Sequence, residues 1–221
     1  MIVAENLALT LSPDNVSNTT LVSETGERLY TVITEHTKKD TITTVRNARD
    51  DVIASLEWRD VLPDRVIFGD TKPTSMAEWM RRSVIPFKDD ITFTDDEGRK
   101  YKWKGNSAGR SFELSCADDN FSTIIARFQR SRRVHMSVPP ETDASASTLS
   151  LAPTLVNHTQ TPAILTLAPR AQQIQDLVVA SFLFLEKTRR INETEHQSRA
   201  DIWGSPMKPV GRNVAVVDGG V

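Results

Sequence analysis

Residues 177–185 read LVVASFLFL and form the most apolar segment of the chain. A helix that is apolar on every side has to be surrounded by other parts of the protein. No helix breaker occurs for several residues on either side, so the run reaches helical length; a buried strand is the alternative. Asp176 lies near the start, and Lys187, Arg189 and Arg190 lie near the end, each sign at the favourable end of the helix dipole. We therefore predict a buried helix over residues 171–190.

The predicted helix is too short to cross a membrane. At about 1.5 Å per residue its apolar part is about 14 Å long, which is about half the thickness of a bilayer core. No other apolar run approaches the roughly 20 residues of a membrane span. The helix is better suited to filling a barrel of strands, and the sequence predicts a soluble protein without a transmembrane span.

Short strands are predicted for the first part of the chain, up to about residue 136. β-branched and aromatic residues alternate there with polar ones, and turn-forming residues recur about every eight to twelve positions, which is typical of a sandwich or barrel. Gly26 and Gly98 each separate two alternating runs, so both are expected in hairpin turns. A short helix is expected after Thr74 and Ser75. The predicted strands are residues 7–11, 19–23, 29–34, 41–46, 52–58, 65–68, 91–94, 99–104, 111–116, 123–129 and 163–167.

The composition changes twice in the second half of the chain. Pro, Ser, Thr and Ala dominate between about residues 137 and 161, which predicts a flexible insertion. Gly and Pro with scattered charges follow the helix, which predicts a flexible tail over residues 191–221. We expect one domain over residues 1–190, because a chain of 221 residues is below the size at which a single core splits.

Charge and cysteine content argue against several classes of protein. The 27 basic residues nearly balance the 29 acidic ones, so no overall field attracts nucleic acid, and no such partner is expected. Cys116 is the only cysteine, so no intramolecular disulfide can form, which fits a reducing compartment. The start of the chain lacks the features of a secretory signal. A cytoplasmic location is therefore predicted.

Four segments carry a resemblance to a known family. They are LYTVIT at 29–34, IASLEW at 53–58, DEGRKYKWK at 96–104, and the end of the apolar helix, EKTRR, at 186–190. In this order they resemble a fungal family of unknown function that is common in basidiomycetes. That family is similar in layout to the tubby-like group, which includes tubby, LURP-one-related and phospholipid scramblase proteins.

The resemblance implies a mainly β fold, namely a closed antiparallel β-barrel around a C-terminal hydrophobic helix. It covers roughly residues 7–136 and 163–190, and the Pro/Ser/Thr-rich insertion departs from it. Its motifs are structural, so it implies no functional residue, and the likeness to lipid-binding proteins is an analogy of fold alone.

Residues 105–109, GNSAG, fit the G-x-S-x-G pattern in which a strained turn exposes a nucleophilic serine, here Ser107. That pattern requires a helix after the serine, whereas residues 110–116 alternate like a strand. A hairpin loop explains the two glycines, and the chain is expected not to be an enzyme.

Three lysines form the first candidate binding site. Lys100, Lys102 and Lys104 alternate with Tyr101 and Trp103, so the lysines share one face of a strand and the aromatic residues share the other. Such a row can hold phosphates, although a solvated outer face is the alternative, because lysines commonly protect exposed strands. A second basic cluster, expected to join the same site, is formed by Arg127, Arg130, Arg132 and Arg133.

No metal site or cofactor is predicted. Acidic residues cluster at 89–90, 95–97 and 118–119, but none has the spacing of a calcium-binding loop, and turn chemistry explains them. The four histidines show no metal-ligand spacing.

Three hypotheses for function remain. The first is a non-enzymatic module that recognises anionic phospholipid headgroups or phosphorylated partners through the two basic clusters. The second is a protein–protein scaffold, to which Ile202 and Trp203 in the tail would contribute an apolar contact. The third is a serine hydrolase that uses Ser107.

Overall fold

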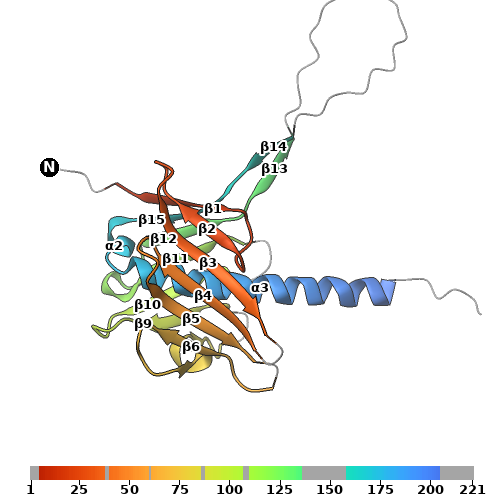
Figure 1. The fold of residues 1–221 in the computed structure, drawn as a ribbon, viewed down its shortest axis with the longest axis horizontal. Helices are drawn as coiled ribbons and strands as arrows, with labels where there is room; N and C mark the ends of the chain where they lie inside the picture. Colours follow the sequence, from red (N-terminus) through yellow and green to blue (C-terminus); the bar gives the residue numbers. More distant parts are fainter. Residues whose placement is uncertain are drawn as a thin grey trace, which may run out of the picture.

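The computed structural model describes residues 5–37, 40–59, 61–85, 88–106, 110–135 and 158–204. Most of these residues belong to one antiparallel sheet of thirteen strands, with the order β7-β6-β5-β4-β3-β2-β1-β15-β12-β11-β10-β9-β8 (Figure 1). Its strands are β1 (Leu7–Ser12), β2 (Thr19–Val22), β3 (Arg28–His36), β4 (Thr41–Asn47), β5 (Val52–Trp58), β6 (Arg65–Phe68), β7 (Thr74–Ser75), β8 (Arg81–Arg82), β9 (Ile91–Thr94), β10 (Lys100–Lys104), β11 (Phe112–Cys116), β12 (Ile124–Gln129) and β15 (Ala163–Leu167).

The mainly β class and all eleven predicted strands are confirmed, with ends that shift by one or two residues. Gly26 and Gly98 both have positive φ in hairpin turns, as predicted. Two strands outside the large sheet were not predicted: β13 (Arg132–His135) and β14 (His158–Thr161) pair with each other. β14 falls within the predicted insertion, most of which lies outside the described residues.

The large sheet is not closed into a barrel. β7 and β8 are its two edge strands, and no ladder joins them in the described part of the chain. They are neighbours in sequence, separated by the short helix α1 (Met76–Trp79) and one residue. The expected closed barrel is therefore not confirmed, because two strands of two residues each pair only with β6 and β9.

Trp79 of α1 packs between the two edges of the sheet. Its ring lies 4.7 Å from that of Phe68 in β6, 6.1 Å from that of Phe93 in β9 and 6.2 Å from that of Phe184 in the long helix (centroid distances). Aromatic contacts at these distances contribute beyond simple burial. Side-chain packing thus bridges the two edges at this point.

The predicted apolar helix is confirmed as α3 (Gln175–Gly204), which follows the single turn of α2 (Pro169–Gln172). Residues 178–185 are all buried, and Figure 1 shows α3 running along the concave side of the sheet. Ser181 is the one polar residue of that segment, and its hydroxyl accepts a hydrogen bond from Trp103 Nε1 of β10 at 3.0 Å. The sheet therefore satisfies the polar group that the helix buries.

The prediction that the helix ends at Arg190 is wrong, because α3 continues to Gly204. Residues 191–203 contain neither Gly nor Pro, so nothing in this segment interrupts the backbone ladder. Figure 1 shows this second half of α3 extending beyond the sheet. Among the described residues, no helix has the length and apolar character to span a membrane. A 3₁₀ turn, η1 (Ala117–Asp119), follows β11.

Candidate functional site

The lysines of β10 share one face of the sheet. Tyr101 and Trp103 are buried, whereas Lys100 and Lys104 are exposed and Lys102 is half-buried. This alternation follows from the two-residue period of a strand. The Lys102 ammonium lies 4.0 Å from the centroid of the Phe121 ring. The predicted sharing of the outer face by the three lysines is therefore present.

The neighbouring strands extend this face with hydroxyl groups and one further cation. Thr94 and Thr92 of β9 lie opposite Lys100 and Lys102. Arg81 of the edge strand β8 lies opposite Thr92 on its other side and is exposed. Residues that lie directly opposite each other in a ladder share a face, so Arg81 joins the lysines. We call Arg81, Lys100, Lys102 and Lys104, with Thr92 and Thr94, the basic face.

No carboxylate lies on the outer positions of β8, β9 and β10, the three strands of the basic face. Glu113 of β11 lies opposite Lys104, but its carboxylate pairs with Arg127 of β12 at 2.9 Å. Lys100 and Lys104 make no ion pair with any described residue. The basic face therefore carries uncompensated positive charge that is open to solvent.

Arg81 was missed by the sequence analysis. Residues 81–82 follow the predicted short helix, and their pattern alone does not show that they form a strand. The Arg81-Arg82 pair was the available signal. The strand β9 was predicted, but its pairing with Arg81 is known only from the fold.

The structure does not bring the four predicted arginines to the lysines as one cluster. Arg127 lies on the outer face but is paired with Glu113, and Arg132 is exposed in the separate two-stranded sheet. The side chain of Arg133 lies outside the described residues. Arg130 points in the opposite direction, toward α3, where it enters a second group of charges.

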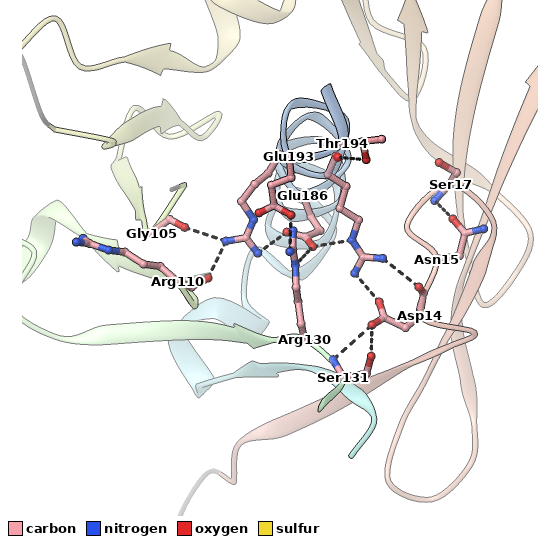
Figure 2. A network of polar contacts seen from close by, with 12 residues as sticks. Asp14, Asn15, Ser17, Gly105, Arg110, Arg130, Ser131, Glu186, Glu193 and Thr194 are labelled. Atoms are coloured by element: carbon pink, nitrogen blue, oxygen red, sulfur yellow. Dashed lines mark hydrogen bonds and ion pairs between the residues drawn. The ribbon is translucent and has the colours of Figure 1, made fainter. Parts of the chain in front are cut away.

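A buried carboxylate, Glu186, organises that second group, which we call the charge cluster (Figure 2). Glu186 has no solvent exposure, and its Oε1 accepts hydrogen bonds from Arg130 Nε at 2.6 Å and Arg190 Nε at 2.7 Å. Its other oxygen forms an ion pair with Arg189. Arg130 also binds Glu193 at 2.7 Å. A buried charge requires such partners to offset the loss of hydration.

The sixth member of the charge cluster is Asp14, in the loop after β1. It accepts hydrogen bonds from the Ser131 hydroxyl at 2.6 Å and from Arg190 (Figure 2). Burial opposes the ionisation of Asp14, but the hydrogen bonds from Ser131 and Arg190 outweigh it and lower the pKa of this carboxyl. With three arginines and three carboxylates the cluster is neutral, so it offers no free charge to a ligand.

Arg189 also fixes the loop that follows β10. Its Nη1 donates to the carbonyl oxygens of Gly105 at 2.9 Å and Arg110 at 2.7 Å. Gly105 has a φ of +85°, and a Cβ at this position would lie 2.0 Å from the carbonyl oxygen of Ser111, so glycine is required. Ser107 lies outside the described residues. The first glycine of the G-x-S-x-G pattern thus has a structural explanation.

Lys187 is a buried cation without a carboxylate partner among the described residues. Its ammonium donates to the Thr43 hydroxyl at 2.6 Å and lies 4.3 Å from the centroid of the Trp58 ring. Burial lowers the pKa of Lys187 to about 8, and the charge of Asp64 opposes this shift only in part. The sequence analysis treated this residue only as a favourable charge at the end of a helix.

A cavity of about 650 Å³ lies beside the start of α3. Its buried acid is already engaged, because Asp95 pairs with Arg99 at 2.7 Å and accepts a hydrogen bond from the Tyr101 hydroxyl at 3.0 Å. Asp176 accepts a hydrogen bond from Tyr30 at 2.6 Å. Within the described ranges, no three potential metal ligands gather in one place.

The fold and the site define a protein with one large antiparallel sheet around a buried helix and an exposed basic face. The chain belongs to the family of unknown function DUF6593, which matches residues 14–191. It is also similar to a protein from Arabidopsis thaliana with an X-ray structure, at 13% identity and a TM-score of 0.46, over 85% of this chain and 98% of that one. No curated protein sequence matches the chain.

Proposed function

We propose that this domain is a non-enzymatic binding module whose basic face recognises the phosphates of anionic lipid headgroups. The observation that supports this proposal is the composition of the outer positions on β8, β9 and β10, where four cations stand among two threonines and no carboxylate. Ammonium and guanidinium groups bind phosphate oxygens, and hydroxyl groups add further donors. A row of cations near an anionic surface contributes about 1 kcal/mol for each residue.

The arginines divide into two roles under this proposal. Arg81 adds a fourth cation to the three lysines, whereas Arg130 belongs to the charge cluster and keeps α3 in place. Arg127 lies close enough to the lysines to contribute to phosphate binding, but its ion pair with Glu113 reduces the charge that it offers to a ligand. We assign Arg132 and Arg133 no role in the contact between the basic face and the phosphates.

The finer fold that we propose is tubby-like, as the resemblance to the fungal family implies, in a cytoplasmic protein. In this interpretation α1 and Trp79 take the place of the missing ladder between β7 and β8. The position of α1 between the two edge strands supports it, as do the ring contacts of Trp79 with β6 and β9. This proposal concerns architecture alone and assigns no ligand.

The test is co-sedimentation with phosphatidylcholine vesicles, with and without phosphatidylinositol bisphosphate, at two salt concentrations. Binding is expected only with the anionic lipid and is expected to weaken with salt, because screening acts on exposed charges. Lys100→Glu/Lys104→Glu reverses two cations without a partner and should abolish binding. The matched control is Arg28→Glu/Arg49→Glu, which makes the same charge change on β3 and in the β4–β5 turn. Equal loss in both variants would show that only net charge matters.

A scaffold role is the second candidate, supported by the part of α3 that extends beyond the sheet (Figure 1). Residues 194–198 are all exposed. Absence of binding to every vesicle, together with binding to a protein partner that depends on this helical extension, would favour it. Hydrolysis by Ser107 predicts labelling by a fluorophosphonate probe, and a blank result removes that hypothesis.

A further inference from the structure

Two pairs of aliphatic residues protrude from loops. Val61 and Leu62, between β5 and β6, are 94% and 54% exposed; Val84 and Ile85, between β8 and β9, are 97% and 53% exposed. Single exposed aliphatic side chains are ordinary on protein surfaces. Two adjacent pairs, each with one side chain almost fully in water, leave apolar area that a partner can remove from solvent.

The two loops flank the same cavity. Pro63, next to Leu62, lines a hollow of about 350 Å³ together with Arg82 and Ile91, which lie at either end of the β8–β9 loop. Phe184 of α3 lines its inner wall. The two aliphatic pairs therefore belong to one region of the surface, at the seam between the two edges of the sheet.

This region continues into the basic face. Arg81 belongs to the basic face and lies three residues before Val84. The pairing of Trp103 with Ile91 places Lys104 at the end of β10 where the β8–β9 loop enters β9. The described residues of that segment carry three cations, Arg81, Arg82 and Lys88, against Asp89 and Asp90. Exposed aliphatic tips thus stand next to a surface with excess positive charge.

We propose that Val84–Ile85 and Val61–Leu62 insert into the interface of an anionic phospholipid bilayer while the basic face binds its headgroups. This proposal rests on the proposed function and adds the orientation of the domain on the membrane. Aliphatic side chains enter the boundary between headgroups and acyl chains, and neighbouring cations bind the phosphates above it. Charge complementarity favours a bilayer over a second copy of the chain, because two copies would bring together the cations of the β8–β9 segment and of the basic face.

The experiment uses the full chain and phosphatidylcholine vesicles that contain phosphatidylinositol bisphosphate. Val84→Ser/Ile85→Ser should weaken binding at least about tenfold, because two aliphatic side chains no longer leave water. The residual binding of this variant should keep its dependence on salt, whereas Lys100→Glu/Lys104→Glu should abolish binding.

A fluorescent probe reports insertion directly. Cys116 is buried, so an environment-sensitive dye attached to Val84→Cys labels one site. Its emission should shift to the blue on addition of the anionic vesicles. The same dye on Ile33→Cys is the control, because Ile33 is 42% exposed on β3, which is separated from β6 by β4 and β5, and should remain in water.

The outcomes separate this proposal from the proposed function. Vesicle binding by the wild type, with full binding of Val84→Ser/Ile85→Ser and no shift of the Val84 dye, would overturn insertion and leave headgroup binding intact. An equal shift of the Ile33 dye would overturn the orientation. Failure of the wild type to bind any anionic vesicle would overturn both. A wild-type dimer that Val84→Ser/Ile85→Ser converts to a monomer in light scattering would overturn insertion by showing that a second copy covers the loops.

Discussion

Arg130, Arg189 and Arg190 each contact the carboxylate of Glu186, whereas Lys100 and Lys104 of the basic face contact no carboxylate among the described residues. Both groups include cations that are close together in the sequence, Arg189 with Arg190 and Lys100 with Lys104. The arginines sit at the end of the apolar part of α3, where burial makes an unpaired charge costly. The lysines face water, where a charge needs no protein partner. The location in the fold, and not the residue type, decides which cations remain available to a ligand.

Among the variants that test this comparison, removal of the Glu186 charge should have the largest effect on stability. Glu186→Gln leaves three arginines around a neutral side chain, and one of them, Arg189, is almost fully buried. Loss of one partner of a buried ion pair costs about 3–5 kcal/mol. Urea denaturation should show a midpoint far below that of the wild type.

The control for this variant is Glu195→Gln, which changes an exposed carboxylate on the same helix. It should leave the midpoint unchanged. A Glu186→Gln protein as stable as the Glu195→Gln protein would mean that the charge cluster does not hold α3 in place.

Lys187 lies in the same helix as the charge cluster but resembles the basic face in lacking a carboxylate partner among the described residues. Its pKa of about 8 in the folded state lies below 10.5, the ordinary value for the unfolded chain. The unfolded state therefore binds more protons between these two values, and the free energy of unfolding should rise with pH from about 8 toward 10.5. Below pH 8 the buried charge lowers stability by an amount on the order of 1–3 kcal/mol.

Lys187→Met removes this charge and should raise the melting temperature at pH 7. Thr43 keeps a hydrogen bond from Trp58 Nε1 at 3.0 Å, so its hydroxyl is not left without a partner. Between pH 8 and 9.5 the advantage of the variant over the wild type should shrink, since the wild-type amine loses its proton there. A constant difference across this range would contradict the lowered pKa.

The Asp14→Asn variant tests how much the partly exposed edge of the charge cluster contributes to stability. Its pKa lies below the ordinary 3.8, so its contribution is present above that value and is lost as pH falls through the folded pKa. Asp14→Asn should lower the free energy of unfolding by about 1 kcal/mol at pH 7, a value that allows for screening by solvent. The denaturation curves of the wild type and of the Asp14→Asn variant should converge at acidic pH; a difference that persists at the lowest pH would argue for packing rather than charge.

The basic face should give the smallest effect on stability. Lys100→Glu/Lys104→Glu changes two exposed side chains that make no ion pair with described residues, so thermal unfolding should match that of the wild type. The same variant should lose vesicle binding, which separates binding from folding. A large drop in melting temperature would contradict this, because it would show that these lysines stabilise the fold as the arginines of the charge cluster do.

The local pattern of the sequence predicted most of the fold. Alternation located Tyr101 and Trp103 in the core and the lysines outside it, and the apolar run of residues 177–185 located the buried helix. The predicted end of the helix was wrong, because the flexible tail was taken to begin directly after Arg190. The first Gly or Pro after Arg190 is Gly204, where α3 ends. Charges in that segment do not stop a helix, since exposed polar residues leave its backbone bonds intact.

Most of the secondary elements, the faces of the predicted strands and the burial of α3 could be read from the sequence alone, because they depend on residues a few positions apart. The meeting of Arg130 with Glu186, 56 residues away, and the place of Arg81 beside the lysines of β10 emerge only when the chain is folded. The same is true of the two edges of the sheet, which meet at α1 without a ladder between β7 and β8. Long-range packing decides which strands become neighbours and which charges form pairs. The sequence pattern, with its period of two residues in a strand or 3.6 in a helix, reports only local structure and does not determine that packing.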